Sequence, residues 1–156
     1  MRVRVIAVGT RMPAWVRSAC VEYLERIPPT SAVTLTQIEP GVRSAGGSAA
    51  RAIAAEGERM LAALRPGEHV VALDERGKEL STRELAAWLK VRRQEGADLA
   101  FLVGGADGLA PAVLERSNFR WSLSRLTLPH ALARVLLAEQ LYRAYSILAH
   151  HPYHRD

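Results

Sequence analysis

Residues 98–108 read Asp-Leu-Ala-Phe-Leu-Val-Gly-Gly-Ala-Asp-Gly, and this stretch decides the class of fold. Its first part, residues 98–103, is nearly continuously apolar, which is typical of a strand buried on both faces of a parallel sheet. Two glycines follow directly, and glycine permits the close backbone approach or the positive φ of a sharp turn. Because ligands of open α/β sheets bind beyond the carboxyl ends of strands, residues 104–108 are a candidate binding turn.

Strands and helices alternate on both sides of this stretch. Short, β-branched, apolar segments predict strands at residues 2–8, 33–38 and 69–73, and an extended segment at 120–128. Helical spacing of apolar residues predicts helices at residues 13–26, 49–64, 110–116 and 131–149. A further helix opens with a capping box of Ser81 and Glu84 and ends near Gln94. Residues 40–48 read as a loop and residues 74–78 as a turn. The alternation predicts an α/β fold, with a mostly parallel sheet flanked by helices.

Length and composition indicate one globular domain, residues 1–156. Hydrophobic residues make up 49% of the chain and charged residues 24%, so a packed core is expected and general disorder is not. The net charge is +5, and a basic protein favours a polyanionic partner such as RNA. Many soluble proteins are equally basic, however, so charge alone does not identify the partner.

The single cysteine, Cys20, excludes an intrachain disulfide and a thiolate metal cluster. Cys20 lies among apolar residues of a predicted helix, which favours a buried filler over a nucleophile. The apolar run near the N-terminus is too short and too charged for a signal peptide or a membrane span. These features predict a cytoplasmic protein that binds neither a membrane nor a metal.

The predicted last helix is unusually apolar. Its polar stripe is narrow and consists of Glu139, Arg143, Ser146 and His150, with the first two spaced as an i,i+4 ion pair. A helix with so little polar surface must be covered on more than one side. A second subunit could supply that cover, which favours a homodimer.

The glycine turn and the C-terminal tail are the two candidate functional segments. The turn lacks the Lys-Ser/Thr of a P-loop and the spacing of a dinucleotide fingerprint, which disfavours phosphate binding. A backbone-lined pocket for an adenine-bearing molecule and a plain tight turn both remain open. The tail places Tyr153, His154 and Arg155 together, and such residues suit base stacking and phosphate contact, although short tails are often disordered. His130, at the start of the last helix, could face the same space.

Over essentially its whole length the chain resembles the ribosomal RNA large subunit methyltransferase H family. The motifs that carry the resemblance are residues 6–10 (Ile-Ala-Val-Gly-Thr), 56–58 (Glu-Gly-Glu), 73–78 (Leu-Asp-Glu-Arg-Gly-Lys), 103–108, 122–130, 141–144 and 151–155. Some members carry Pro-Glu where this chain has Ala106 and Asp107, which is a mild departure.

The resemblance implies a SPOUT-class fold with a C-terminal trefoil knot, although general rules of chain topology disfavour knots. It also implies a homodimer that uses S-adenosylmethionine. The implied reaction is methylation of N3 of pseudouridine-1915 in 23S ribosomal RNA, within the assembled 70S ribosome.

The resemblance further implies two groups of site residues. The cofactor pocket should use Leu73, Gly105, Leu123, Ser124, Arg125, Leu126, Thr127 and Leu128, the last six mainly through their backbone. The catalytic residues on the substrate side should be His130, Tyr153, His154 and Arg155. We expect His154 or His130 to handle the N3 proton, Arg155 to hold phosphate or the developing anion, and Tyr153 to stack on the base.

Two other classes of function compete with this one. A non-catalytic ribosome-binding protein of the same fold would bind no S-adenosylmethionine. An unknotted nucleotide-binding α/β domain would need a recognisable phosphate loop, and the sequence carries none.

Overall fold

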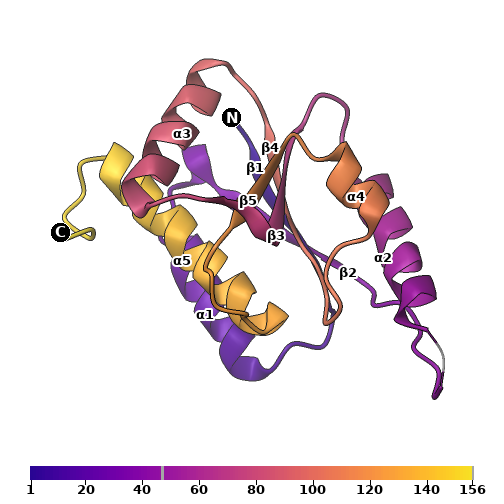
Figure 1. Ribbon diagram of the computed structural model, residues 1–156. Helices are drawn as coiled ribbons and strands as arrows, with labels where there is room; N and C mark the ends of the chain where they lie inside the picture. Colours follow the sequence, from indigo (N-terminus) through magenta and orange to yellow (C-terminus); the bar gives the residue numbers. More distant parts are fainter. Residues whose placement is uncertain (47, 156) are drawn as a thin grey trace.

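The computed structural model describes residues 1–46 and 48–155. Gly47, in the predicted loop 40–48, and Asp156, at the end of the predicted domain, lie outside the described residues. A five-stranded parallel sheet has the strand order β2-β1-β4-β3-β5 (Figure 1). The strands are β1 (Val3–Val8), β2 (Val33–Ile38), β3 (His69–Glu79), β4 (Leu99–Val103) and β5 (Phe119–Ser122). The prediction of an α/β fold with a parallel sheet is confirmed.

Helices cover both faces of the sheet. They are α1 (Ala14–Glu25), α2 (Ala49–Ala63), α3 (Thr82–Gln94), α4 (Pro111–Arg116) and α5 (His130–Leu148), with a short 3-10 turn at Pro29–Ser31. Helix α5 packs between α1 and α3 on one face, while α2 and α4 lie together on the other (Figure 1). The predicted helix boundaries differ from the observed ones by one or two residues at most.

Strand β4 lies at the centre of the sheet, and all of its residues are buried. Its Phe101 packs with apolar residues of α3 and α5, including Leu85 and Leu137. On the other face, Leu102 packs with Met60 of α2 and Val113 of α4. Apolar layers on both faces explain why this strand reads as a continuous apolar run in the sequence.

The predicted turn at residues 74–78 is wrong. Strand β3 continues to Glu79, and its register with β5 shifts between Leu73 and Lys78, which both pair with Trp121. A Cβ on Gly77 would stand 2.6 Å from the carbonyl carbon of Arg120. The glycine therefore permits two backbones to approach closely within an irregular strand pair.

The predicted extended segment 120–128 is also too long, because β5 ends at Ser122. Beyond it the Ser122 hydroxyl donates to the carbonyl of Ser124 at 2.9 Å, and the Leu126 N–H donates to the Ser124 hydroxyl at 2.9 Å. Such local side-chain bonds give the backbone an alternative to sheet pairing. Residues 123–129 therefore form a loop beside the strand ends.

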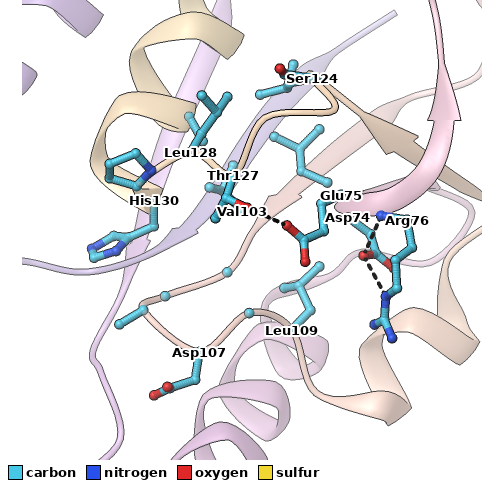
Figure 2. A pocket seen from close by; sticks show the side chains of 18 of the residues that line it. Asp74, Glu75, Arg76, Val103, Asp107, Leu109, Ser124, Thr127, Leu128 and His130 are labelled. Atoms are coloured by element: carbon cyan, nitrogen blue, oxygen red, sulfur yellow. Dashed lines mark hydrogen bonds and ion pairs between the residues drawn. The ribbon is translucent and has the colours of Figure 1, made fainter.

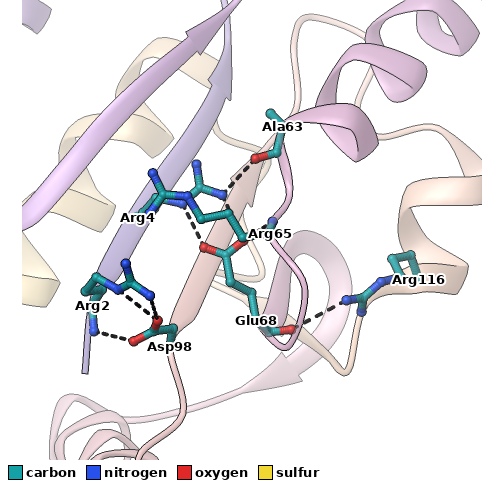
Figure 3. Close-up of polar contacts among 7 residues, drawn as sticks. All are labelled: Arg2, Arg4, Ala63, Arg65, Glu68, Asp98 and Arg116. Atoms are coloured by element: carbon teal, nitrogen blue, oxygen red, sulfur yellow. Dashed lines mark hydrogen bonds and ion pairs between the residues drawn. The ribbon is translucent and has the colours of Figure 1, made fainter.

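Two polar residues, one in α5 and one in β1, are buried. Ser146, which the sequence placed on the polar stripe, is fully buried and donates its hydroxyl to the carbonyl of Arg143. Arg4 of β1 is 7% exposed, and its guanidinium bonds both carboxylate oxygens of the buried Glu68, at 2.7 and 2.8 Å (Figure 3). At both positions a hydrogen-bond partner offsets the cost of burying the polar group.

The predicted capping box is confirmed and offers a test of local stability. The Glu84 N–H donates to the Ser81 hydroxyl oxygen, and the Ser81 N–H donates to the Glu84 carboxylate. We expect Ser81→Ala to lower the free energy of unfolding by about 1 kcal/mol, measured by urea denaturation. Ser81→Asp retains a capping oxygen and should stay near wild type; equal losses in both variants would contradict this explanation.

Candidate active site

A pocket of about 800 Å³ opens at the carboxyl end of β4, beside the irregular part of β3 (Figure 2). Its walls come from three segments that are distant in sequence: residues 73–76, residues 103–109 and the loop that leads into α5. The volume lies in the range of small-molecule sites. The second and third segments follow β4 and β5, and residues 73–76 lie in the irregular part of β3 just beyond its pairing with β4. The pocket therefore occupies the edge where open α/β sheets bind their ligands.

The structure brings most of the predicted cofactor residues around this pocket. The lining includes Leu73, Gly105, Leu123, Ser124, Leu126, Thr127 and Leu128. His130 lines it as well (Figure 2). Arg125 does not, because its side chain is 86% exposed and its Nε lies 3.8 Å from the carboxylate of Glu79.

The glycine turn is fixed by backbone contacts. The Gly108 N–H donates to the carbonyl of Gly105 at 3.1 Å. A Cβ on Gly104 would stand 2.7 Å from the carbonyl carbon of Gly108, and a Cβ on Gly105 would stand 3.0 Å from the Val8 Cγ1. The turn therefore has no space for a side chain at Gly104 and leaves only a tight contact with Val8 at Gly105, which favours the paired glycines after β4.

The pocket carries more acidic than basic side chains. Asp74, Glu75 and Asp107 line it with Arg76, and Asp74 accepts the Arg76 N–H at 3.1 Å (Figure 2). Such a lining repels phosphate groups and suits ligands with positive charge or hydroxyl groups. The nucleotide-binding alternative, which needs a phosphate site, finds no support in this pocket.

An ion-pair network, in which only Glu56 is buried, holds the glycine turn to α2. Arg43 donates to Glu56 Oε1 at 2.7 Å and to Asp107 Oδ2 at 2.8 Å, and both carboxylates raise its pKa. Glu56 is only 3% exposed and also accepts the Gly41 N–H at 3.2 Å. Sequence reasoning missed this network. The available signal was a carboxylate on the apolar face of a helix, which needs a partner when it is buried.

A second, smaller pocket of about 380 Å³ adjoins the first. The two pockets share Gly105, Ala106 and His130. The remaining wall comes from the ends of β1 and β2 and from α2, and it consists of Val8, Gly9, Thr10, Arg11, Met12, Glu39, Pro40 and Glu56. His130 thus stands between two cavities at the same edge of the sheet.

The C-terminal tail lies away from both pockets within one chain. The Tyr153 ring packs on Tyr142 at 4.5 Å between ring centroids, and its hydroxyl donates to Glu139 at 3.1 Å. Burial, followed by the hydrogen bond to Glu139, raises the pKa of Tyr153 to about 12. His154 Nδ1 lies 3.4 Å from a guanidinium nitrogen of Arg143.

The separation follows from the length of α5. Between His130 and Arg143 the helix rises about 20 Å. The four predicted catalytic residues therefore fall into two places in one chain, with His130 at the pockets and the tail near the far end of α5 (Figure 1).

Within residues 1–46 and 48–155, the acidic, histidine and cysteine side chains form no group of three or more that could hold a metal ion. In the same ranges we find no helix that is both long and apolar enough to cross a membrane.

Solved structures of low sequence identity share the fold. A probable methylase family protein from Haemophilus influenzae has a TM-score of 0.58 at 14% identity, over 99% of this chain and 70% of that chain. A probable methyltransferase from Bordetella pertussis has a TM-score of 0.53 at 16% identity, over 92% of this chain and 96% of that chain.

The family model described as "Predicted SPOUT methyltransferase" matches residues 1–154. The parallel sheet, the pocket at its strand ends and this match define a methyltransferase of the SPOUT class. Two proteins named ribosomal RNA large subunit methyltransferase H, from Chromohalobacter salexigens and Thiobacillus denitrificans, are 56% and 52% identical to this chain. The alignments cover 99% and 100% of this chain and all of both relatives. The chain belongs to the ribosomal RNA large subunit methyltransferase H family, and the resemblance found in the sequence is confirmed.

Proposed function

We propose that the protein transfers the methyl group of S-adenosylmethionine to N3 of pseudouridine-1915 of 23S ribosomal RNA, on the 70S ribosome in the cytoplasm. The observation that carries the proposal is the acidic pocket at the strand ends, built from the segments that the family resemblance assigns to the cofactor. The names of the relatives support an rRNA substrate, and the resemblance supports the particular base.

The chemistry of the pocket fits S-adenosylmethionine. Its sulfonium and ammonium groups are positive, and its ribose offers two hydroxyl groups to carboxylates such as Asp74 and Glu75. Backbone groups of the glycine turn and of residues 123–128 are available to the adenine edge. When bound, the cofactor supplies an electrophilic methyl group. The task of the chain is to hold the target nitrogen in line with it.

His130 is the predicted catalytic residue that borders the pockets directly. Its imidazole can exchange a proton with a base held in either cavity. Together with His154 it remains a candidate for handling the N3 proton, while Arg155 would hold phosphate and Tyr153 would stack on RNA.

A homodimer would bring the two halves of this site together. Helix α5 leaves Leu132, Leu136 and Ile147 only half-buried, and Trp15 of the neighbouring α1 is 56% exposed. Covering these side chains with a second subunit removes apolar surface from water. Because a tail cannot reach His130 of its own chain, we propose that the partner's tail completes each pocket.

The trefoil knot is part of the same proposal. It is supported by the close approach of two backbones at Gly77 and Arg120, and by the loop 123–129 that leads from there into α5. We place residues 1–156 in this single knotted domain.

The direct test of the function is a methylation assay on ribosomes that lack the modification. We expect one methyl group at N3 of the target pseudouridine in 70S ribosomes, and far less on large subunits or free 23S RNA. Shape recognition on an assembled particle is expected of a protein with few basic loops. Equal methylation of free RNA, or none of any substrate, would overturn the proposal.

Mixing two inactive variants tests whether the tail acts across the dimer. We expect Gly104→Ala to disable the cofactor pocket and Arg155→Ala to disable the tail, each in its own chain. A heterodimer of the two retains one intact pocket and one intact partner tail, so it should recover about half of the wild-type activity. The matched control pairs a wild-type chain with a chain that carries both changes. It should be inactive if the tail acts on the partner, and active if the tail acts on its own chain.

A further inference from the structure

We propose that the second pocket receives the target base and that Glu56 is the catalytic residue that accepts its N3 proton. This inference rests on the proposed methyl transfer to a pseudouridine. It moves the proton acceptor from the histidines to a carboxylate, and it leaves His130 to donate a hydrogen bond to a ring carbonyl.

The position of the second pocket is the first argument. It shares Gly105, Ala106 and His130 with the larger pocket, so the two cavities adjoin at these residues. Methyl transfer requires the nucleophile and the methyl carbon to be in near contact and in line. A base in the second pocket would face a cofactor in the first across the turn formed by Gly105.

The walls of the second pocket suit one pyrimidine ring. Val8, Met12 and Pro40 provide apolar surface for its faces, and the volume of about 380 Å³ is small. At the rim, Arg11 is exposed and free to contact a phosphate of the same nucleotide. A base must leave its stack to enter such a cavity, as it does in other enzymes that modify bases.

Glu56 lines the second pocket, and its carboxylate is held through one oxygen. Oε1 accepts from Arg43 at 2.7 Å and from the Gly41 N–H at 3.2 Å. Oε2 lies 3.5 Å from the position that a Cβ on Gly105 would take, which places it beside the turn shared by both pockets. The negative charge is balanced by Arg43, and burial fixes the orientation of the side chain.

A fixed carboxylate is the right group for this base. It repels phosphate but accepts a hydrogen bond from an imide N–H, such as N3–H of a pyrimidine ring. In the step, the N3–H bond breaks and the proton moves to Glu56 Oε2. The electron pair on N3 forms the bond to the methyl carbon, and the carbon–sulfur bond breaks with its electron pair remaining on sulfur as a neutral thioether. The proton then passes to water.

Glu56→Gln tests the role, because glutamine keeps the shape of the side chain but is a much weaker base. We expect kcat to fall about 100-fold or more, while KM for ribosomes and the calorimetric Kd for S-adenosylmethionine change less than about twofold. Glu58→Gln, an exposed change on the same helix, is the matched control and should retain wild-type kcat. Full kcat in Glu56→Gln, or a loss that appears only in KM or in cofactor binding, would overturn the assignment.

A crosslinking experiment tests whether the target base binds in the second pocket. It uses wild-type protein and no cofactor. Ribosomes with a photoreactive 4-thiouridine at the target position should crosslink to peptides that contain residues 8–12 or 39–40. Crosslinks found only elsewhere, with a wild-type enzyme that methylates normal ribosomes, would refute the pocket while leaving the proposed function intact. A wild-type enzyme that methylates no ribosome would instead refute the proposed function.

Discussion

Gly104→Ala is expected to abolish binding of S-adenosylmethionine while the protein remains folded. The new Cβ would stand 2.7 Å from the carbonyl carbon and 2.8 Å from the carbonyl oxygen of Gly108, and both of these are backbone atoms that cannot rotate away. The turn at residues 104–108 must open to relieve the clash, and it forms one wall of the pocket proposed for the cofactor. Because a displacement of about 1 Å can cost 100-fold in catalysis, we expect losses of at least that order in Kd and kcat/KM.

Gly96→Ala is the matched control for this substitution. Gly96 has a φ of +70° and open space around its Cα, so alanine there causes backbone strain without a clash. That strain is worth about 1–2 kcal/mol of stability, and calorimetric binding should be unchanged. Wild-type cofactor affinity in Gly104→Ala would show that the turn does not form the binding wall.

The sequence predicted the layers and nearly all of the helices because they depend on local patterns. The continuous apolar run at residues 98–103 and the Ser81–Glu84 capping box each contain the whole signal within a few residues. The irregular end of β3 could not be predicted in this way. Gly77 reads as a turn residue, and only the approach of Arg120, which is distant in sequence, makes it part of a strand pair.

The candidate site shows the same difference between what local patterns predict and what depends on contacts between distant residues. The rule on strand ends pointed to the pocket that we propose for the cofactor, since it needs only the order of elements. The network of Arg43, Glu56 and Asp107 joins residues up to 64 positions apart. Likewise, the docking of Tyr153 against Glu139 depends on how the tail folds back along α5. Residue types suggested that the tail was functional, but only the three-dimensional structure reveals that it lies away from His130 in its own chain.

Glu68→Ala is expected to be the most destabilising of the single changes considered. Glu68 is 5% exposed and accepts two bonds from Arg4 and a third, at 2.7 Å, from the Arg65 N–H (Figure 3). Removing it leaves the buried Arg4 guanidinium charged and without its carboxylate partner, although its bond to the carbonyl of Ala63 in α2 can remain. Breaking one side of a buried ion pair costs about 3–5 kcal/mol, which should appear as a lower urea midpoint at pH 7.

The exposed pair of Arg2 and Asp98 provides the control, because its side chains are 73% and 28% exposed. Asp98→Ala should cost only about 0–1 kcal/mol at the same protein concentration.

The pH dependence of the unfolding free energy gives a second test of the buried pair. Burial raises the pKa of Glu68, but the bonds from Arg4 and the Arg65 N–H outweigh burial and leave the pKa below the ordinary glutamate value. The stabilisation is therefore present above the unfolded-state pKa and is lost as the pH falls through the folded-state pKa. The difference in unfolding free energy between wild type and Glu68→Ala should therefore narrow in acid. A difference that stays constant with pH would mean that the buried pair does not contribute as its geometry predicts. A loss no larger than that of Asp98→Ala would mean the same.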